Sequence, residues 1–383
     1  MIIESAKRLQ QTSEYYFSRK LKEVRALAAA GKPIINMGVG SPDLPPPPHV
    51  IDALTRSLID GPAHQYQSYK GLPQLTQAMS DFYNNKYEVQ LDPETEILPL
   101  MGSKEGIMHI SMAFLNQRDQ VLIPNPGYPT YSSVTNLLEA EPVYYNLDAS
   151  HNWMPNYDEL ESLDLSKVKL MWVNYPHMPT GAKATTKDFE RLIAFATKNN
   201  ILLVNDNPYS FILNENPQSI LSIPGAKEVA LELNSLSKSF NMSGWRVGML
   251  LGAEDYVNAV LTVKSNMDSG MFYGIQKGAA AVLTEGTSWF NELNLVYKSR
   301  RELMWQLADV LGCTYDREAA GMFIWAKLPE GSLDAEAFID DILIEKSIFI
   351  TPGTIFGSQG AGYIRFSLCV SEDKIREAIS RFK

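Results

Sequence analysis

Between residues 95 and 252, short apolar runs alternate with stretches in which apolar residues recur at helical spacing. This alternation is typical of an α/β fold, in which a mostly parallel sheet is covered by helices. Several runs are apolar throughout, which predicts strands buried on both faces. Helices are expected at Lys104–Leu115 and Thr186–Asn199. The seven predicted strands are Ile97–Leu100, Gln120–Ile123, Pro142–Tyr145, Val168–Asn174, Ile201–Asp206, Val229–Asn234 and Val247–Leu251.

The two ends of the chain follow a different pattern. Near the start, residues 14–31 are amphipathic and the pattern stops at Gly31, which predicts a helix. Near the end, a long helical stretch is followed by short strands and a further helix. In chain order, these elements are expected at 290–311 (helix), 321–328 (strand), 333–345 (helix), 348–350 (strand) and 363–368 (strand).

The length of 383 residues exceeds the size at which single cores usually stop growing, so we expect two domains. Pro45 to Pro48 form a rigid extended spacer and provide a natural crossing point. We therefore predict a large domain at 46–290. The smaller domain, of the α+β class, combines residues 1–45 with residues 291–383.

Composition excludes several classes of function. The formal net charge of −10 argues against a nucleic-acid-binding protein, which needs basic residues to neutralise phosphates. No run approaches the roughly 18 apolar residues of a membrane helix, and no signal peptide is visible. Cys313 and Cys369 are far apart and are interpreted as free thiols of a cytoplasmic protein. The five histidines show no metal-ligand spacing, so we expect no metal site.

A candidate for covalent chemistry lies in the segment Ser235-Leu236-Ser237-Lys238, directly after a predicted strand. A partly desolvated lysine loses its proton more easily and can form a Schiff base. A solvated loop lysine is the ordinary alternative. Arg246 follows eight residues later, and together with the hydroxyl groups of Ser235 and Ser237 it would form a cup for a phosphate group.

A second candidate follows the strand at 201–206, which ends in Asp206, with Tyr209 three residues later. The aspartate could simply cap the next turn. However, an enzyme that uses pyridoxal phosphate (PLP) needs a carboxylate beside the pyridine nitrogen, because a protonated ring is an electron sink. Tyr209 could then donate a hydrogen bond to the phenolic oxygen of the cofactor.

Glycine-containing loops supply further candidates for anion binding. Gly102-Ser103-Lys104 leads from a strand into a helix, whose N-terminus is a natural anion site, although Ser103 could also be only the helix N-cap. The segment is not a Walker A loop. The segment from Gly38 to Gly40 is no dinucleotide fingerprint, which disfavours a nicotinamide dehydrogenase.

In this order, these segments resemble the class I and II aminotransferases, which are aspartate aminotransferase-like PLP enzymes of fold type I. The match runs from about residue 34 to residue 368. Its most diagnostic parts are the Ser-Leu-Ser-Lys segment with Arg246, the pair Asp206 and Tyr209, and Pro179-Thr180-Gly181. Regulators built on this fold carry an additional N-terminal DNA-binding domain, for which the roughly 33 preceding residues leave no room.

The resemblance implies that Lys238 forms an aldimine with PLP and moves a proton during transfer of an amino group from an amino acid to a 2-oxo acid. Asp206 and Tyr209 are the other catalytic residues that it implies. Gly40 and Arg365 would bind the substrate carboxylate. Tyr66 would reach the phosphate of a neighbouring subunit, which implies a homodimer. The full set of cofactor-binding residues implied is Tyr66, Ser103, Lys104, Tyr128, Asn174, Asp206, Tyr209, Ser235, Ser237, Lys238 and Arg246.

One position departs from the family pattern, which usually reads Asn-Pro-Thr-Gly. Met178 stands here in place of that asparagine, whose amide donates to the cofactor's phenolic oxygen and helps to orient the carboxylate clamp. A thioether cannot donate. We expect the imine to hold its proton to a higher pH than in relatives with asparagine, unless Met178 is only part of an apolar wall.

The identity of the substrate is less constrained than the cofactor site. A PLP-dependent lyase of the same fold that eliminates a β-substituent is the alternative function. Side-chain selectivity is expected from the segments Tyr15–Phe17, Lys264–Phe272 and Thr351–Phe356. Lys264 could meet an acidic side chain of the substrate, but a solvated lysine is the simpler expectation.

Overall fold

A seven-stranded sheet forms the centre of the computed structural model, which describes residues 3–11, 16–332 and 334–383. Its strand order is β2-β8-β7-β6-β5-β3-β4. Strands β3 to β7 pair in parallel, and β8 runs antiparallel to both of its neighbours. The strands are β2 (Ile97–Leu100), β3 (Gln120–Asn125), β4 (Glu141–Asn146), β5 (Val168–Val173), β6 (Leu202–Asp206), β7 (Ala230–Ser235) and β8 (Gly248–Leu251).

Helices cover both faces of this sheet. One face packs against α2 (Pro48–Ser57), α3 (Pro73–Tyr87), α6 (Tyr157–Ser162), α7 (Thr186–Asn199) and α10 (Tyr273–Val282). The other face packs against α4 (Ser103–Phe114), α5 (Thr130–Leu137) and α9 (Glu254–Lys264). Because the central strands are covered on both sides, β6, β7 and β8 are buried at every position, as the sequence predicted. The expected mostly parallel sheet of seven strands is confirmed.

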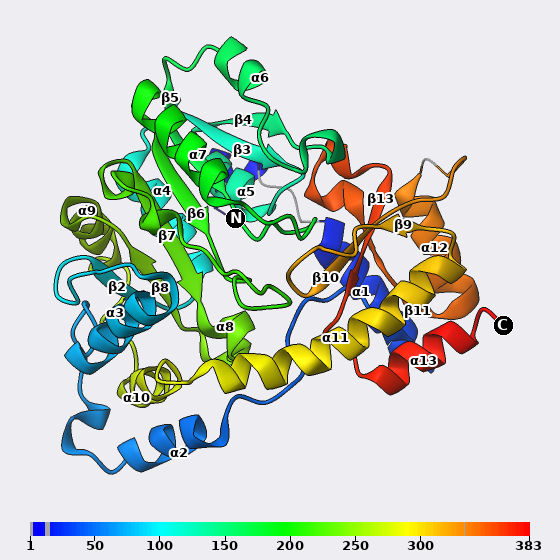
Figure 1. Cartoon of the computed structure of the whole chain (residues 1–383), viewed down its shortest axis with the longest axis horizontal. Coiled ribbons are helices and arrows are strands. Elements are labelled where there is room, and N and C mark those ends of the chain that lie inside the picture. The colour runs from blue at the N-terminus through cyan, green and yellow to red at the C-terminus, as the bar shows by residue number, and fades with distance from the viewer. Residues whose placement is uncertain (1–2, 12–15, 333) are drawn as a thin grey trace.

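A smaller α+β unit contains the two ends of the chain. Its four-stranded antiparallel sheet has the order β12-β13-β10-β9, and β1 pairs in parallel with β11. Helix α1 (Tyr16–Ala29) lies beside these strands in Figure 1 and contributes Val24 to their core. The other elements are α11 (Thr287–Val310), α12 (Ala335–Lys346), α13 (Glu372–Ser380), β1 (Ile35–Asn36), β9 (Thr314–Tyr315), β10 (Phe323–Lys327), β11 (Ile348–Phe349), β12 (Thr351–Pro352) and β13 (Tyr363–Ser367).

Helix α11 connects the two units, since Phe290 packs in the core of the large sheet and the residues from Leu293 onward pack in the smaller core. Figure 1 shows it as the long yellow helix that reaches α13.

Residues 14, 15 and 333 of the predicted helices lie outside the described residues. The division into residues 46–290 and residues 1–45 with 291–383 stays a prediction. The remaining elements are the short helix α8 (Leu236–Ser239) and the 3₁₀ turns Lys7–Gln11, Gly61–His64, Ala149–His151, Ile220–Ser222, Ala226–Glu228, Ser243–Trp245, Gly353–Phe356 and Ser358–Gly360.

Candidate active site

A cavity of about 580 Å³ opens at the carboxyl ends of the parallel strands, where ligands bind in sheets of this kind. Strands β5, β6 and β7 each end at this cavity. Of the residues that the sequence predicted for the site, all but Tyr66 line it. The predicted residues that line the cavity are Gly40, Ser103, Lys104, Tyr128, Asn174, Asp206, Tyr209, Ser235, Ser237, Lys238, Arg246 and Arg365.

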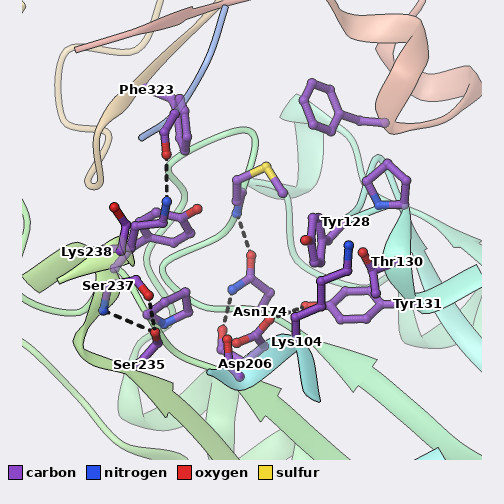
Figure 2. A pocket seen from close by; sticks show the side chains of 18 of the residues that line it. Lys104, Tyr128, Thr130, Tyr131, Asn174, Asp206, Ser235, Ser237, Lys238 and Phe323 are labelled. Atoms are coloured by element: carbon purple, nitrogen blue, oxygen red, sulfur yellow. Dashed lines mark hydrogen bonds between the residues drawn. The ribbon is translucent and has the colours of Figure 1, made fainter. Parts of the chain in front are cut away.

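Lys238 lies on α8, the single helical turn that follows β7. Ser235 caps this turn, because its hydroxyl oxygen accepts a hydrogen bond from the backbone N–H of Ser237 at 3.2 Å. The Lys238 ammonium points into the cavity and donates to the carbonyl oxygen of Gly40 at 2.6 Å (Figure 2). Burial lowers the pKa of Lys238 below its usual value, since the charged form is poorly solvated there. The uncharged amine therefore forms at a lower pH than in a solvated lysine.

A polar cup lies on one side of the lysine. The Ser235 hydroxyl donates to the Ser237 hydroxyl at 2.9 Å, and an Arg246 Nη1–H reaches the same Ser237 oxygen at 3.5 Å. Arg246 has a left-handed backbone conformation, with φ of 57°. Two hydroxyls and a guanidinium in this arrangement suit a phosphate group.

The N-terminus of α4 completes the cup. Gly102 precedes this helix with φ of 91°, and a Cβ atom there would lie 2.1 Å from Arg246 Nη2. Only glycine lets the guanidinium come this close to the start of the helix. The interpretation of Ser103 as N-cap is wrong, because Gly102 is the N-cap and Ser103 is the first helical residue. Its hydroxyl is left for the cavity, which it lines.

Asp206 ends β6 at the floor of the cavity (Figure 2). Its Oδ2 accepts a hydrogen bond from the Tyr131 hydroxyl at 3.0 Å, whereas its Oδ1 is buried and has no partner among the described residues. Burial raises the pKa of Asp206 to about 7, and the Tyr131 hydrogen bond acts in the opposite direction. A cationic group beside Oδ1 would stabilise the charged carboxylate.

Sequence reasoning missed Tyr131. Its ring stacks on Trp172, with 4.8 Å between centroids and 5° between planes, and this fixes its hydroxyl beside Asp206. Tyr131 lies on α5, three residues after Tyr128, and the two rings meet edge to face at 5.6 Å. Tyr128 lies in the loop before this helix, so helical spacing gave no signal for Tyr131.

Asn174 and Tyr209 flank Asp206. The Asn174 amide donates to the backbone carbonyl of Asp206 and accepts from the backbone N–H of Met178 at 2.7 Å. The side chain therefore connects two loops of the site. Tyr209 is buried and its ring meets Phe323 edge to face at 5.7 Å. Burial raises the pKa of Tyr209 above its usual value, so its hydroxyl stays protonated and can donate.

Arg365, on β13, supplies a buried cation at the far side of the cavity. Its Nη2 donates to the Gly38 carbonyl at 2.9 Å, and its Nη1 lies 3.3 Å from Met178 Sδ. The guanidinium carbon is 4.0 Å from the centre of the Phe323 ring and 4.7 Å from that of Phe356. Burial lowers the pKa of Arg365 to about 10. The planar fork is thus held by aromatic faces and is suited to a carboxylate ligand.

Tyr66 is the one predicted site residue outside the cavity of the single chain. It is 91% exposed and lines a separate surface hollow with Tyr69 and Ser269. Its contact with a neighbouring subunit stays a prediction. Such a contact would also explain why a large aromatic side chain is so exposed.

The segments expected to select the substrate have mixed outcomes. Ile355 and Phe356 line the cavity, whereas Tyr15 lies outside the described residues. The expectation that Lys264 is solvated is wrong, since its side chain is 1% exposed and pairs with Asp268. Asp268 also lies close to Glu105 and His109, a group that could ligate a metal. The Lys264 ammonium already supplies a cation to that group.

These residues together fit one class of ligand. A buried carboxylate with a free oxygen calls for a cationic ring nitrogen, the polar cup for a phosphate, and the buried amine for a carbonyl carbon. Tyr128 borders the cavity opposite Lys238 and offers an aromatic face to a flat ring (Figure 2). A phosphorylated pyridine aldehyde combines all four features.

Comparison with known proteins agrees with this fit. The family model for aminotransferase class I and II matches residues 32–382. An LL-diaminopimelate aminotransferase of Dehalococcoides mccartyi is 38% identical over 378 residues, which cover 98% of this chain and 97% of the relative. Substrate-bound BacF of Bacillus subtilis superposes with a TM-score of 0.94 at 33% identity, covering 99% of this chain and 97% of BacF. An aminotransferase of Staphylococcus aureus gives a TM-score of 0.89 at 32% identity, covering 98% of each chain.

Proposed function

Because the chain belongs to the family of class I and II aminotransferases, we propose that it uses PLP, held in this cavity, to move an amino group from an amino acid to a 2-oxo acid. One observation carries the proposal: the buried amine of Lys238 and the free carboxylate oxygen of Asp206 face the same cavity, beside the polar cup of Ser235, Ser237 and Arg246. PLP, when bound, supplies an electron sink for charge that develops at the substrate's α-carbon.

The cofactor would be held at both ends and on one face. Asp206 keeps the ring nitrogen protonated, and Tyr131 supports Asp206 by donating to its other oxygen. Tyr128 packs against the ring, and Tyr209 donates to the phenolic oxygen. The phosphate is bound by Ser103, Lys104, Ser235, Ser237 and Arg246.

Lys238 would first anchor the cofactor and then act as the base. After a substrate has displaced it, its Nζ remains in the cavity as the group that accepts the proton from the α-carbon. The lowered pKa suits this role, because a base must be uncharged before it can take up a proton. The same amine would then return the proton at the cofactor end, and water would hydrolyse the remaining carbon–nitrogen double bond to release the 2-oxo acid.

Both substrates carry an α-carboxylate, and Arg365 is the group to bind it. The guanidinium fork matches a carboxylate in a bidentate fashion, and the Gly40 N–H would add a third donor. Binding at Arg365 fixes the substrate at one end, so that its α-carbon lies over the cofactor and within reach of Lys238.

The active unit would be a homodimer in which Tyr66 of one chain reaches the phosphate cup of the other. Support comes from the exposure of Tyr66 and of the large apolar side chains Ile59, Met267 and Phe272. A second copy of the chain could cover such exposed side chains.

Product analysis tests the proposal. Purified protein is incubated with PLP, 2-oxoglutarate and a panel of amino donors that includes LL-diaminopimelate, the substrate in the names of the curated relatives. We expect glutamate to form from at least one donor, and Lys238→Ala to abolish its formation. Ammonia and pyruvate released without an acceptor would instead indicate the β-eliminating lyase.

A further inference from the structure

Arg365 is short of hydrogen-bond acceptors. A guanidinium carries five N–H donors, and this one is 6% exposed. Among the described residues, its acceptors are the Gly38 carbonyl oxygen and the Met178 sulfur, and its Nε has none. No carboxyl group is among the causes of its pKa shift. Besides the ring faces of Phe323 and Phe356, the orientation of the fork therefore depends on these two polar contacts, of which the sulfur is one.

Met178 is itself held in a fixed place. Its side chain is buried, and its backbone N–H donates to Asn174 Oδ1 at 2.7 Å, a contact drawn in Figure 2. The Asn174 Nδ2 donates in turn to the Asp206 carbonyl. One chain of contacts thus runs from Asp206 through Asn174 and Met178 to Arg365, and it joins the two ends of the site.

We propose that Met178 is a positioning residue whose thioether sulfur orients Arg365 for the substrate carboxylate. The inference rests on the proposed function, since it assigns the carboxylate to Arg365. A thioether is a weak acceptor. It steers the Nη1–H without satisfying it fully, and an incoming carboxylate readily takes over that donor. An amide oxygen in the same place would hold the guanidinium more firmly, so the sulfur favours exchange of the ligand.

Three variants separate this role from simple packing. Met178→Leu keeps the volume and apolar character but removes the acceptor. Met178→Gln restores an acceptor at a similar reach. Met304→Leu is the matched control, because Met304 is fully buried in the same core cluster, on α11, and does not line the cavity. Thermal unfolding verifies that each variant is folded.

The measurements are the dissociation constant of 3-phenylpropionate, a carboxylate without an amino group, by calorimetry on PLP-loaded protein, and kcat and KM for transamination. For Met178→Leu we expect the dissociation constant and both substrate KM values to rise about fivefold, the effect of losing one weak hydrogen bond, with kcat within about twofold. Met178→Gln should recover most of the affinity, and Met304→Leu should match the wild type.

Unchanged affinity in Met178→Leu would overturn the proposal, and so would an equal loss in Met304→Leu. A fall in kcat at constant KM would also overturn it, because it would place Met178 in the chemistry. Failure of the proposed function is a distinct result: the wild type would then neither load PLP on Lys238 nor form a new amino acid.

Discussion

Asp206 combines complete burial with a pKa raised to about 7 in the protein alone. Its unfolded value is near 3.9. Between these two values the folded protein holds a proton that the unfolded chain has released. The stability that this group contributes is thus fully present below pH 4 and is lost as pH rises toward 7.

We therefore predict that PLP-free wild type loses stability relative to Asp206→Asn as pH rises from 4 to 7. The upper bound is about 4 kcal/mol, from a shift of roughly three pKa units. Chemical unfolding of both proteins across this range measures the difference. A constant difference would show that Asp206 does not titrate in this window.

Tyr131→Phe removes the only hydrogen bond to the Asp206 carboxylate that the described residues provide. The ring still stacks on Trp172, so the fold should be unaffected. We expect kcat to fall about tenfold, since a hydrogen bond to a charged group contributes roughly 1.5 kcal/mol. Steady-state kinetics measure kcat, and a melting curve verifies that the variant is folded. Wild-type turnover would mean that Asp206 needs no support from Tyr131.

Met178→Asn restores the amide that the family usually carries. We predict that the pH at which the visible absorbance of the PLP-loaded protein changes is lower in this variant, because the added donor stabilises the phenolate of the cofactor. Absorbance titrations of both proteins provide the test. Superimposable curves would show that residue 178 does not act on the phenolic oxygen.

Local sequence pointed to residues at or after strand ends that line the cavity, such as Asp206 and Lys238, because the ends of apolar runs are visible in sequence. It did not identify Tyr131 of helix α5, whose role depends on Trp172 in strand β5. It also misjudged Lys264, because the burial of a helix-end lysine depends on the loop that folds over it. Such long-range contacts leave no local pattern.

At the scale of elements, the turn before α4 sets the shape of the phosphate cup. We predict that Gly102→Ala weakens PLP binding about tenfold or more, since a Cβ would strain the positive φ and displace Arg246. Gly244→Ala is the matched control, because nothing lies within 4 Å of its added Cβ. PLP titration followed by absorbance compares the two, and equal affinities would contradict this account of the cup.

The strands of the large sheet start and end close to the predicted positions, because each contains a short apolar run that is bounded by polar residues. Helix 186–199 matches α7, whose start is fixed by a capping box of Thr185 and Asp188. The two-residue strands β1, β9 and β12 were not predicted. Two residues are too few to show an alternating pattern.

At the scale of the whole molecule, the proposed sharing of each site between two subunits makes a prediction about mixed dimers. Lys238→Ala and Tyr66→Ala each damage a different half of one site. Unfolding and refolding an equal mixture of the two should restore about a quarter of wild-type activity, because half of the dimers are mixed and each has one intact site. No recovery above the single variants would argue that Tyr66 acts within its own chain or not at all.

The overall architecture was accessible from sequence because the order of apolar runs fixes a parallel sheet and its covering helices. Both cysteines are free, as predicted, and both are buried. In the described part of the chain, no helix is both long and apolar enough to span a membrane. The exposure of Tyr66 became visible only in the folded chain.

The central claim is that Lys238 forms a covalent bond to PLP while Asp206 holds the ring nitrogen. Borohydride reduction of PLP-incubated protein, followed by peptide mass spectrometry, tests it most directly. The account predicts a pyridoxyl group on the Nζ of Lys238. An unmodified Lys238, with or without label on other lysines, would contradict it.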